Sequence, residues 1–157
     1  MPPQAAPSFS SLPLSRDQLQ VLQELGFTAP TPVQLQSIPL LLQGKDLIGQ
    51  SETGSGKTAA FTLPMLHKLT TGRSKTNKFG VDGIAALVLT PTRELAAQVE
   101  ESVRTYGKYL PLTSTVIFGG VGMTPQIDRV KKGVDILVAT PGRLLDLQQQ
   151  GLSLIHI

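Results

Sequence analysis

A glycine-rich segment that ends in lysine and threonine carries the clearest chemistry in this sequence. Its residues are Ser51-Glu52-Thr53-Gly54-Ser55-Gly56-Lys57-Thr58. Gly54 and Gly56 allow backbone N–H groups to point inward without interference from a Cβ atom, so that they can bind an anion. Lys57 can reach the β- and γ-phosphates of a nucleotide, and the Thr58 hydroxyl can hold Mg²⁺. The segment predicts a phosphate-binding loop. The strict pattern has glycine where Ser51 stands, and a plain flexible loop is the alternative.

The elements on either side of this loop must position it. Asp46–Gln50 is a short strand-like run, and Ala59–Leu69 has the composition of a helix. A turn between a strand and a helix directs its N–H groups along the helix N-terminus, where the helix dipole adds partial positive charge. The flanking pattern therefore favours the phosphate-binding interpretation.

A second candidate for chemistry is a pattern that occurs twice. Thr90-Pro91-Thr92-Arg93 follows the apolar run Leu87–Leu89, and Thr140-Pro141-Gly142-Arg143 follows Ile136–Ala139. Proline suits the first position of a helix, since the N–H that it lacks has no partner there. Each turn therefore offers free backbone donors and one arginine at the carboxyl end of a strand. In a parallel sheet these strand ends share the edge where ligands bind.

Several anion sites on one edge suit the consecutive phosphates of a polynucleotide. Gly119-Gly120, after the strand-like run that ends at Phe118, would allow another backbone to approach closely. The alternative is that each Thr-Pro turn only begins the following helix, and that its arginine forms a salt bridge. The shared edge favours phosphate binding.

Apolar runs and amphipathic segments alternate after the glycine-rich loop. The predicted strands are Ile84–Leu89, Thr113–Phe118 and Ile136–Ala139, and the predicted helices are Arg93–Lys108, Pro125–Lys132 and Leu144–Gln149. Because the strands are apolar on both sides, we expect an α/β fold, in which a parallel sheet has helices on both faces. The polar segment Arg73–Gly83 is expected to be a surface loop.

The first part of the chain is predicted to be helical. Residues 1–8 are rich in Pro, Ala and Ser and are expected to form a flexible arm. Ser15–Gln18 fits a capping box ahead of a helix that Gly26 ends. Thr31–Gln34 fits a second box, with proline at the first helical position, and Gly44 ends that helix.

Composition narrows the class of protein. The chain has 157 residues, a net charge of +3 and no cysteine, which excludes a disulfide framework and thiolate metal sites. No apolar run approaches the ~20 residues that span a bilayer, and no secretory signal is recognisable, so we expect a cytoplasmic protein that does not contact a membrane. The charge permits a nucleic-acid partner without requiring one.

Several segments match, in order, the motifs of one known family. They are Phe9, Gly26-Phe27-Thr28-Ala29-Pro30-Thr31-Pro32-Val33-Gln34, Ser51–Thr58, Pro91-Thr92-Arg93-Glu94-Leu95-Ala96, Gly119-Gly120 and Thr140–Arg143. They resemble the Q motif with its upstream aromatic, motif I, motif Ia, the GG element and motif Ib of DEAD-box RNA helicases. Motif I of that family carries Ala or Ser in place of the first glycine, which accounts for Ser51. The resemblance implies a RecA-like P-loop NTPase domain and ATP hydrolysis coupled to local unwinding of RNA duplexes.

The resemblance also implies residue roles. Gln34 would read the adenine edge, Phe27 would stack on the base and Phe9 would support the pocket. Ser51–Thr58 would hold ATP and Mg²⁺, with Lys57 and Thr58 as the catalytic positions. Single-stranded RNA would be held by its backbone, without sequence preference, through Pro91, Thr92, Arg93, Gly119, Gly120, Thr140, Pro141, Gly142 and Arg143. The alternatives are a capping bond for Gln34 and core packing for the two phenylalanines.

The family also has an Asp-Glu-Ala-Asp motif on the strand that follows motif Ib, and this sequence has no such string. The chain continues past Gly151 as an apolar, strand-like tail, Leu152–Ile157. We therefore expect an N-terminal fragment with negligible turnover of its own, in which 9–45 form the Q-motif helical region. Residues 46–157 would form a RecA-like helicase ATP-binding domain that is incomplete at the C-terminus.

Two other functions remain open at this point. One is a non-catalytic module that binds ATP or RNA and is complete as it stands. The other is a different P-loop enzyme, such as a GTPase or a small-molecule kinase. GTPases read guanine with Asn-Lys-x-Asp, and the nearest string here, Asn77-Lys78-Phe79-Gly80, lacks the acid. The oligomeric state and the RNA target are not encoded in these motifs.

Overall fold

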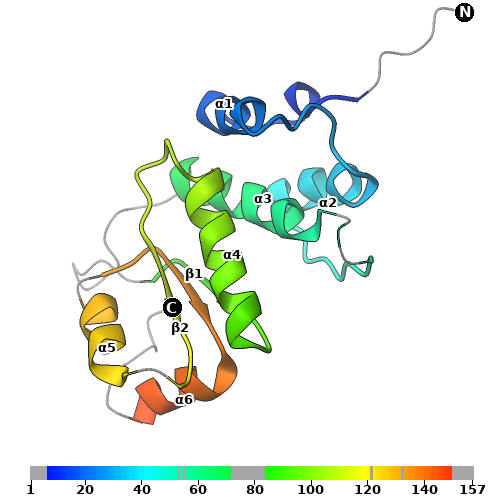
Figure 1. Cartoon of the computed structure of the whole chain (residues 1–157). Helices are drawn as coiled ribbons and strands as arrows, with labels where there is room; N and C mark the ends of the chain where they lie inside the picture. Colours follow the sequence, from blue (N-terminus) through cyan, green and yellow to red (C-terminus); the bar gives the residue numbers. More distant parts are fainter. Residues whose placement is uncertain are drawn as a thin grey trace, which may run out of the picture. The chain divides into compact units, whose positions relative to one another are not determined.

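The structure is a computed structural model that describes residues 7–52, 54, 56–71, 84–120, 122–131 and 133–149. The chain divides into two compact units (Figure 1). The first comprises Met1–Thr71 and Thr105–Leu110, and the second comprises Gly72–Arg104 and Pro111–Ile157. The predictions for residues 1–6 of the expected arm, for Arg73–Gly83, for the tail Leu152–Ile157, and for Thr53 and Ser55 within the glycine-rich loop lie outside the described residues.

The first unit is helical. It contains the short 3₁₀ helix η1 (Phe9–Ser11) and the helices α1 (Arg16–Glu24), α2 (Pro32–Leu42) and α3 (Lys57–Thr71). The predicted capping box at the start of α1 is confirmed, since the Ser15 N–H donates to Gln18 Oε1 at 3.2 Å and the Gln18 N–H donates to Ser15 Oγ at 3.3 Å. Gly26, with φ of +77°, ends α1 as predicted, and Gly44, with φ of +84°, follows α2 in the same way.

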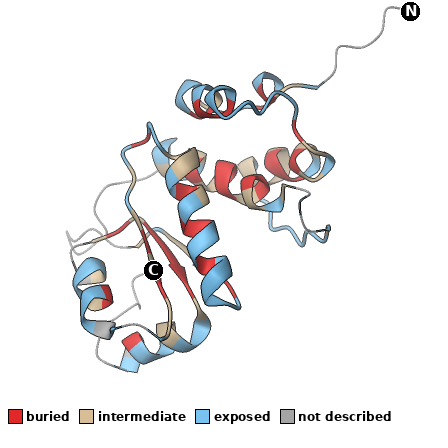
Figure 2. Ribbon diagram, viewed as in Figure 1, coloured by how far each residue is buried: buried red, intermediate tan, exposed pale blue. Residues whose placement is uncertain are grey.

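A compact apolar core holds these helices together (Figure 2). It consists of Phe9, Leu12, Leu14, Leu22, Ile38, Ala59 and Leu63, with Leu19, Leu42 and Tyr106 packed against it. A fully buried glutamine also joins α1 to α3, because Gln18 Nε2 donates to the Leu63 carbonyl at 2.8 Å. Burial of an amide is tolerated when its hydrogen bonds are made, and this one fixes the approach of the two helices.

The second unit is built on a parallel sheet. Its elements are β1 (Ala86–Leu89), α4 (Arg93–Tyr106), β2 (Ser114–Ile117), α5 (Met123–Lys131), β3 (Ile136–Ala139) and α6 (Pro141–Gln149), and the last two residues of α4 belong to the first unit. The strand order is β1-β3-β2, with all pairings parallel. The predicted α/β class and parallel sheet are confirmed.

The two faces of the sheet are covered by different helices. Leu137 and Ala139 on β3 share a core cluster with Leu147 of α6, against which Ile127 and Val130 of α5 pack. The alternate residues point to the other face, where Ser114 Oγ donates to Glu100 Oε1 of α4 at 3.1 Å. Figure 1 shows α4 and α5 on either side of the strands, as right-handed crossovers in opposite directions require.

One predicted strand is wrong. Asp46–Gln50 forms no regular secondary structure, and Leu47 and Ile48 are exposed, Ile48 completely. Among the described strands, none pairs with this segment, so extended backbone here would leave its N–H and C=O groups without ladder partners. Two apolar side chains next to Lys45, Asp46 and Gly49 are too few to hold a strand by burial alone.

Several helices begin earlier than predicted. α6 begins at Pro141 rather than Leu144, α5 at Met123 rather than Pro125, and α3 at Lys57 rather than Ala59. Proline is accepted in the first turn of a helix, since its missing N–H needs no intrahelical partner there.

No helix in the described part of the chain has the length and apolar character needed to cross a bilayer.

Candidate nucleotide and nucleic-acid sites

The glycine-rich segment leads directly into α3, which begins at Lys57. Gly54 and Gly56 have φ of +83° and +88°, a left-handed conformation that only glycine adopts without strain. The first intrahelical bond runs from the Ala60 N–H to the Gly56 carbonyl at 3.1 Å, so the N–H groups before Ala60 are the ones that a helix N-terminus leaves for an anion. The residues of the loop therefore fit the triphosphate group that the sequence predicts.

Lys57 lies across this loop. Its Nζ donates to the Ser51 carbonyl oxygen at 2.6 Å, although the side chain is otherwise exposed. A carbonyl oxygen carries only a partial charge, so a phosphate oxygen would be a stronger partner for the ammonium group. Thr58, the predicted Mg²⁺ ligand, is half-buried at the next position. Among the described residues, no group of His, Cys, Asp and Glu side chains could by itself hold a metal ion.

Gln34 joins the second capping box to the glycine-rich loop. Its Oε1 accepts from the Thr31 N–H at 3.0 Å, and its Nε2 donates to the Gly56 carbonyl at 3.2 Å. The capping bond that the sequence offers as an alternative role is therefore confirmed, while the adenine contact stays a prediction. The contact with Gly56 was not predicted, because it joins residues far apart in the sequence.

Gly56 is closely packed against the same amide. A Cβ atom added at Gly56 would lie 3.1 Å from Thr31 Oγ1 and 3.2 Å from Gln34 Cδ, and closer still to Gln34 Nε2. A Cβ added at Gly54 would meet no atom within 4 Å. The two glycines thus share a backbone conformation and differ in their surroundings.

The two predicted pocket phenylalanines occupy different environments. Phe9 is buried in the core of the first unit, with 5% of its surface exposed, so the packing alternative is confirmed for this residue. Phe27 is 43% exposed, and its ring lies 6.4 Å from the Tyr106 ring at 48°. Phe27 is therefore accessible to a base, and its contact with Tyr106 was not predicted, because the two residues lie far apart in the sequence.

The predicted nucleic-acid turns follow the carboxyl ends of the strands in the second unit. Leu89 and Ile117 are both in register with Ala139, so the three strands end level with one another. The Thr90 N–H donates to the Ala139 carbonyl at 2.9 Å, and the Thr140 N–H donates to the Ile117 carbonyl at 3.2 Å. The structure thus brings the two Thr-Pro-x-Arg turns and Gly119-Gly120 together along one sheet edge.

Exposure differs among the residues of these turns. Pro91, Thr92, Arg93, Gly120, Pro141 and Gly142 are exposed, and Gly119, Thr140 and Arg143 are half-buried. Helix-start chemistry is present as well, because Thr92 Oγ1 accepts from the Leu95 N–H at 3.2 Å. Phosphate binding and helix capping are compatible at this turn, since Thr92 caps α4 and still lies on the surface.

Arg93 packs onto the glycine turn. Its guanidinium lies 5.3 Å from the centre of the Phe118 ring, a cation–π distance. A Cβ atom added at Gly120, where φ is +82°, would lie 3.2 Å from Arg93 Cζ and closer still to Nη1. Phe118 was not among the predicted site residues. Its aromatic ring directly before Gly-Gly is the signal that could have identified it.

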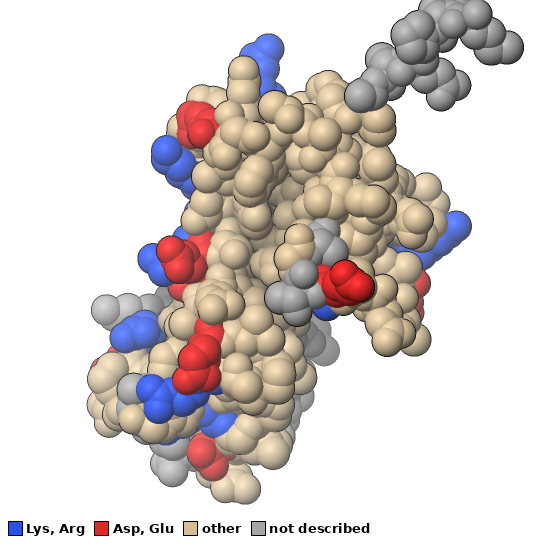
Figure 3. Space-filling view, turned by 45° about the vertical axis from the view of Figure 1, so that its right-hand side comes forward, with Lys and Arg blue, Asp and Glu red and all other residues tan. Residues whose placement is uncertain are grey.

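Charged side chains of both signs are mixed on the face of the molecule drawn in Figure 3. Lys and Arg side chains are interspersed with Asp and Glu, and no broad region of one sign is visible there. This pattern agrees with the net charge of +3. At the sheet edge, the turns offer backbone donors and single arginines as phosphate-binding groups.

Comparison with known proteins gives consistent results. The sequence model of the family described as "DEAD/DEAH box helicase" matches residues 31–156. A "Pre-mRNA-processing ATP-dependent RNA helicase" of Neurospora crassa is 43% identical over 145 residues, which are 92% of this chain and 12% of that protein. The "DEAD-box ATP-dependent RNA helicase RhpA" of Helicobacter pylori is 42% identical over 140 residues, 89% of this chain and 27% of that protein. The chain thus spans about a quarter or less of the length of these relatives.

Solved structures show the same similarity. A DEAD box protein from Methanococcus jannaschii has a TM-score of 0.82 and 38% identity, and the match covers 96% of this chain and 39% of that one. A hypothetical ATP-dependent RNA helicase from Sulfolobus tokodaii has a TM-score of 0.76 and 41% identity, over 89% of this chain and 38% of that one. The RecA-like fold expected from the sequence is confirmed by these neighbours.

Proposed function

Because this chain belongs to the DEAD/DEAH box helicase family, we propose that it is the ATP-binding part of an ATP-dependent RNA helicase. In this proposal, the protein hydrolyses ATP and couples the reaction to the separation of short RNA duplexes. The first unit contributes the nucleotide site, and the second contributes turns that bind single-stranded RNA.

The observation that carries the proposal is the position of Lys57. Its ammonium group lies over the glycine-rich loop at the Ser51 carbonyl, 2.6 Å away, at the start of α3. Bound ATP supplies a phosphoanhydride bond whose hydrolysis can drive conformational change. The loop N–H groups and Lys57 bind its phosphate oxygens, and the Thr58 hydroxyl holds Mg²⁺.

Adenine recognition is assigned to the residues that flank this loop. Phe27 offers an exposed ring face for stacking. Gln34 has an amide that both donates and accepts, which suits the adenine edge, and its bond to Gly56 keeps that amide next to the phosphate loop. A base bound by Gln34 is therefore linked, through one hydrogen bond, to the backbone of the phosphate-binding loop.

RNA binding is assigned to the three turns at the sheet edge. Backbone N–H groups and arginines contact phosphates and sugars, which carry no sequence information. We therefore propose binding to single strands with little dependence on sequence and strong dependence on salt.

The first experiment measures nucleotide binding by the 157-residue chain with Mg²⁺. Lys57→Ala should weaken ATP binding about tenfold or more, because a charge-assisted hydrogen bond to phosphate is lost. Lys68→Ala is the matched control, since Lys68 is an exposed lysine near the far end of the same helix. Equal ATP affinity for the two variants would contradict the proposed phosphate site.

A second measurement tests the base. The chain should bind ATP more tightly than GTP, and Gln34→Ala should reduce that preference. The ratio of ATP affinity to GTP affinity is the relevant quantity, because loss of the Gln34 bond to Gly56 in the phosphate loop affects the binding of both nucleotides. Equal binding of ATP and GTP by the unaltered chain would instead favour another kind of P-loop enzyme.

A further inference from the structure

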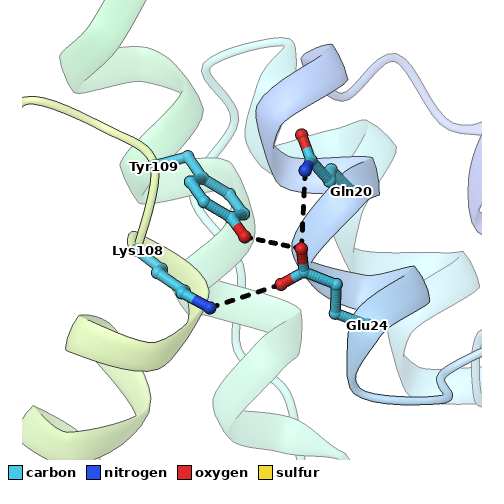
Figure 4. Close-up of polar contacts among 4 residues, drawn as sticks. All are labelled: Gln20, Glu24, Lys108 and Tyr109. Atoms are coloured by element: carbon cyan, nitrogen blue, oxygen red, sulfur yellow. Dashed lines mark hydrogen bonds and ion pairs between the residues drawn. The ribbon is translucent and has the colours of Figure 1, made fainter.

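Two distant segments of the first unit meet around one carboxylate, Glu24 at the end of α1 (Figure 4). The Tyr109 hydroxyl donates to Glu24 Oε1 at 2.5 Å, and Lys108 Nζ lies 3.5 Å from Oε2. Gln20 Nε2, one turn earlier on α1, donates to Oε1 at 3.4 Å. The carboxylate therefore accepts from both segments at once and ties the end of α1 to residues 108–109.

These contacts shift the pKa values of Glu24 and Lys108. The Tyr109 hydroxyl, with Lys108 contributing, holds the pKa of Glu24 below its ordinary value. The Tyr109 hydrogen bond, reinforced by the Glu24 carboxylate, raises the pKa of Lys108. Glu24 is thus an anion and Lys108 a cation at neutral pH, which is the charge state in which the three groups attract one another.

The backbone between Glu24 and Phe27 is fixed. The Phe27 N–H donates to the Leu22 carbonyl at 2.9 Å, and the Gly26 N–H donates to the Gln23 carbonyl at 3.0 Å. These paired bonds, with Gly26 at φ of +77°, form a Schellman motif. Holding Glu24 therefore holds the Cα of Phe27.

The Phe27 ring has its own support from the same region of the chain. It lies 6.4 Å from the ring of Tyr106, the last residue of α4, three residues before Tyr109. Tyr106 packs against the core of the first unit, and its burial raises the pKa of its hydroxyl. A ring anchored in this core is a fixed surface for Phe27, which keeps 43% of its own surface exposed.

We propose that Tyr106, Lys108 and Tyr109 form a positioning platform that holds the Phe27 ring in the orientation needed to stack on a nucleotide base. This inference rests on the proposed ATP-binding function. The platform residues do not contact the base themselves. They act by restricting the Phe27 side chain before the ligand binds. Less conformational entropy is then lost on binding, so the base is bound more tightly although no new contact to it is made.

The test compares two ligands on the full chain, ATP and inorganic tripolyphosphate, each with Mg²⁺. Both ligands engage the phosphate loop, but only ATP has a base, so the ratio of the two affinities isolates the base contact. Tyr106→Leu should weaken ATP binding about three- to tenfold, which is the range expected for ordering one side chain, and leave tripolyphosphate unchanged. Tyr109→Phe, which removes only the hydroxyl, should act in the same direction by a smaller factor.

The control is Glu101→Gln, which removes an exposed carboxylate from α4, outside the platform. It should leave the ratio at the value of the unaltered chain. If Tyr106→Leu does not fold, Tyr109→Phe carries the test alone, because its ring is kept and its side chain lies at the surface.

The outcomes separate the two proposals. An unaltered chain that binds no ATP contradicts the proposed function. An unaltered chain that prefers ATP to tripolyphosphate, with the same preference in both tyrosine variants, overturns only the platform. Equal losses for both ligands would also overturn it, since they would show that the tyrosines support the loop rather than the base contact.

Discussion

Replacing Gly56 with alanine should destabilise the first unit more than replacing Gly54, although both glycines have nearly the same backbone conformation. Their φ angles are +88° and +83°, so an L-residue meets similar strain at either position. Only at Gly56 does the new Cβ also collide with the amide of Gln34. The pair therefore separates backbone strain from displacement of the glutamine.

The magnitude follows from the contacts. A left-handed alanine costs about 1–2 kcal/mol, and reduced freedom of the unfolded chain offsets roughly 0.4–1 kcal/mol of that. At Gly56 the displaced Gln34 also loses its bonds to the Gly56 carbonyl and the Thr31 N–H, each with a net value of about 0.5–1.5 kcal/mol. We expect a loss of about 1 kcal/mol for Gly54→Ala and about 2–4 kcal/mol for Gly56→Ala.

Urea unfolding followed by tyrosine fluorescence gives the required measurement. The chain has two tyrosines and no tryptophan, and both tyrosines, Tyr106 and Tyr109, belong to the first unit. Their emission therefore reports on the unit that contains the glycine-rich loop. A change in midpoint at constant slope measures the change in stability.

A double-mutant cycle tests the reasoning. Once Gln34→Ala has removed the amide, Gly56→Ala should destabilise no more than Gly54→Ala does, so the two changes should be non-additive by about 1–3 kcal/mol. Equal destabilisation by the two single glycine variants, or strict additivity in the cycle, would refute the claim that Gln34 packs on the loop backbone.

Three further predictions concern other contacts. Gly120→Ala should displace the arginine that packs on it, weaken binding to single-stranded RNA and reduce the slope of log affinity against log salt by about 0.7, whereas Gly49→Ala, whose Cβ meets nothing within 4 Å and which lies outside the RNA-binding turns, should change neither. Glu100→Ala should lower the free energy of unfolding, measured by circular dichroism, by about 1–3 kcal/mol, because this buried carboxylate accepts from a strand hydroxyl at 3.1 Å and from an arginine at 2.9 Å; a loss below 0.5 kcal/mol would contradict that role. The Tyr109 hydroxyl holds the pKa of Glu24 below its ordinary value, so Glu24 contributes stability above its ordinary pKa and loses that contribution as pH falls through the lowered pKa. Thermal unfolding should therefore show a smaller gap between Glu24→Gln and the unaltered chain at pH 3 than at pH 6, and a gap independent of pH would refute the linkage.

Features set by neighbouring residues could be predicted from the sequence. The Ser15–Gln18 box, the turn at Gly26 and the three parallel strands all depend on side chains a few positions apart or on strand apolarity. The turns after the strands could also be placed on one edge, because parallel strands that end level bring their following turns together.

Features set by distant residues could not be predicted. Phe27 meets Tyr106, and Arg93 meets Phe118, only after the chain has folded, and no local pattern encodes either contact. Asp46–Gln50 failed for the same reason, since a strand depends on a neighbour as well as on its own composition. The adenine and RNA roles stay predictions, because they depend on ligands rather than on contacts within the chain.

The strand order has a consequence for how the protein is made. β3 is the central strand, fully buried, and it is the last of the described strands to leave the ribosome. Until Ile136–Ala139 has been synthesised, β1 and β2 have no described strand to bind, because each pairs only with β3. The sheet should therefore assemble late and in a single step, and nascent chains shorter than this point should expose apolar edges that molecular chaperones recognise.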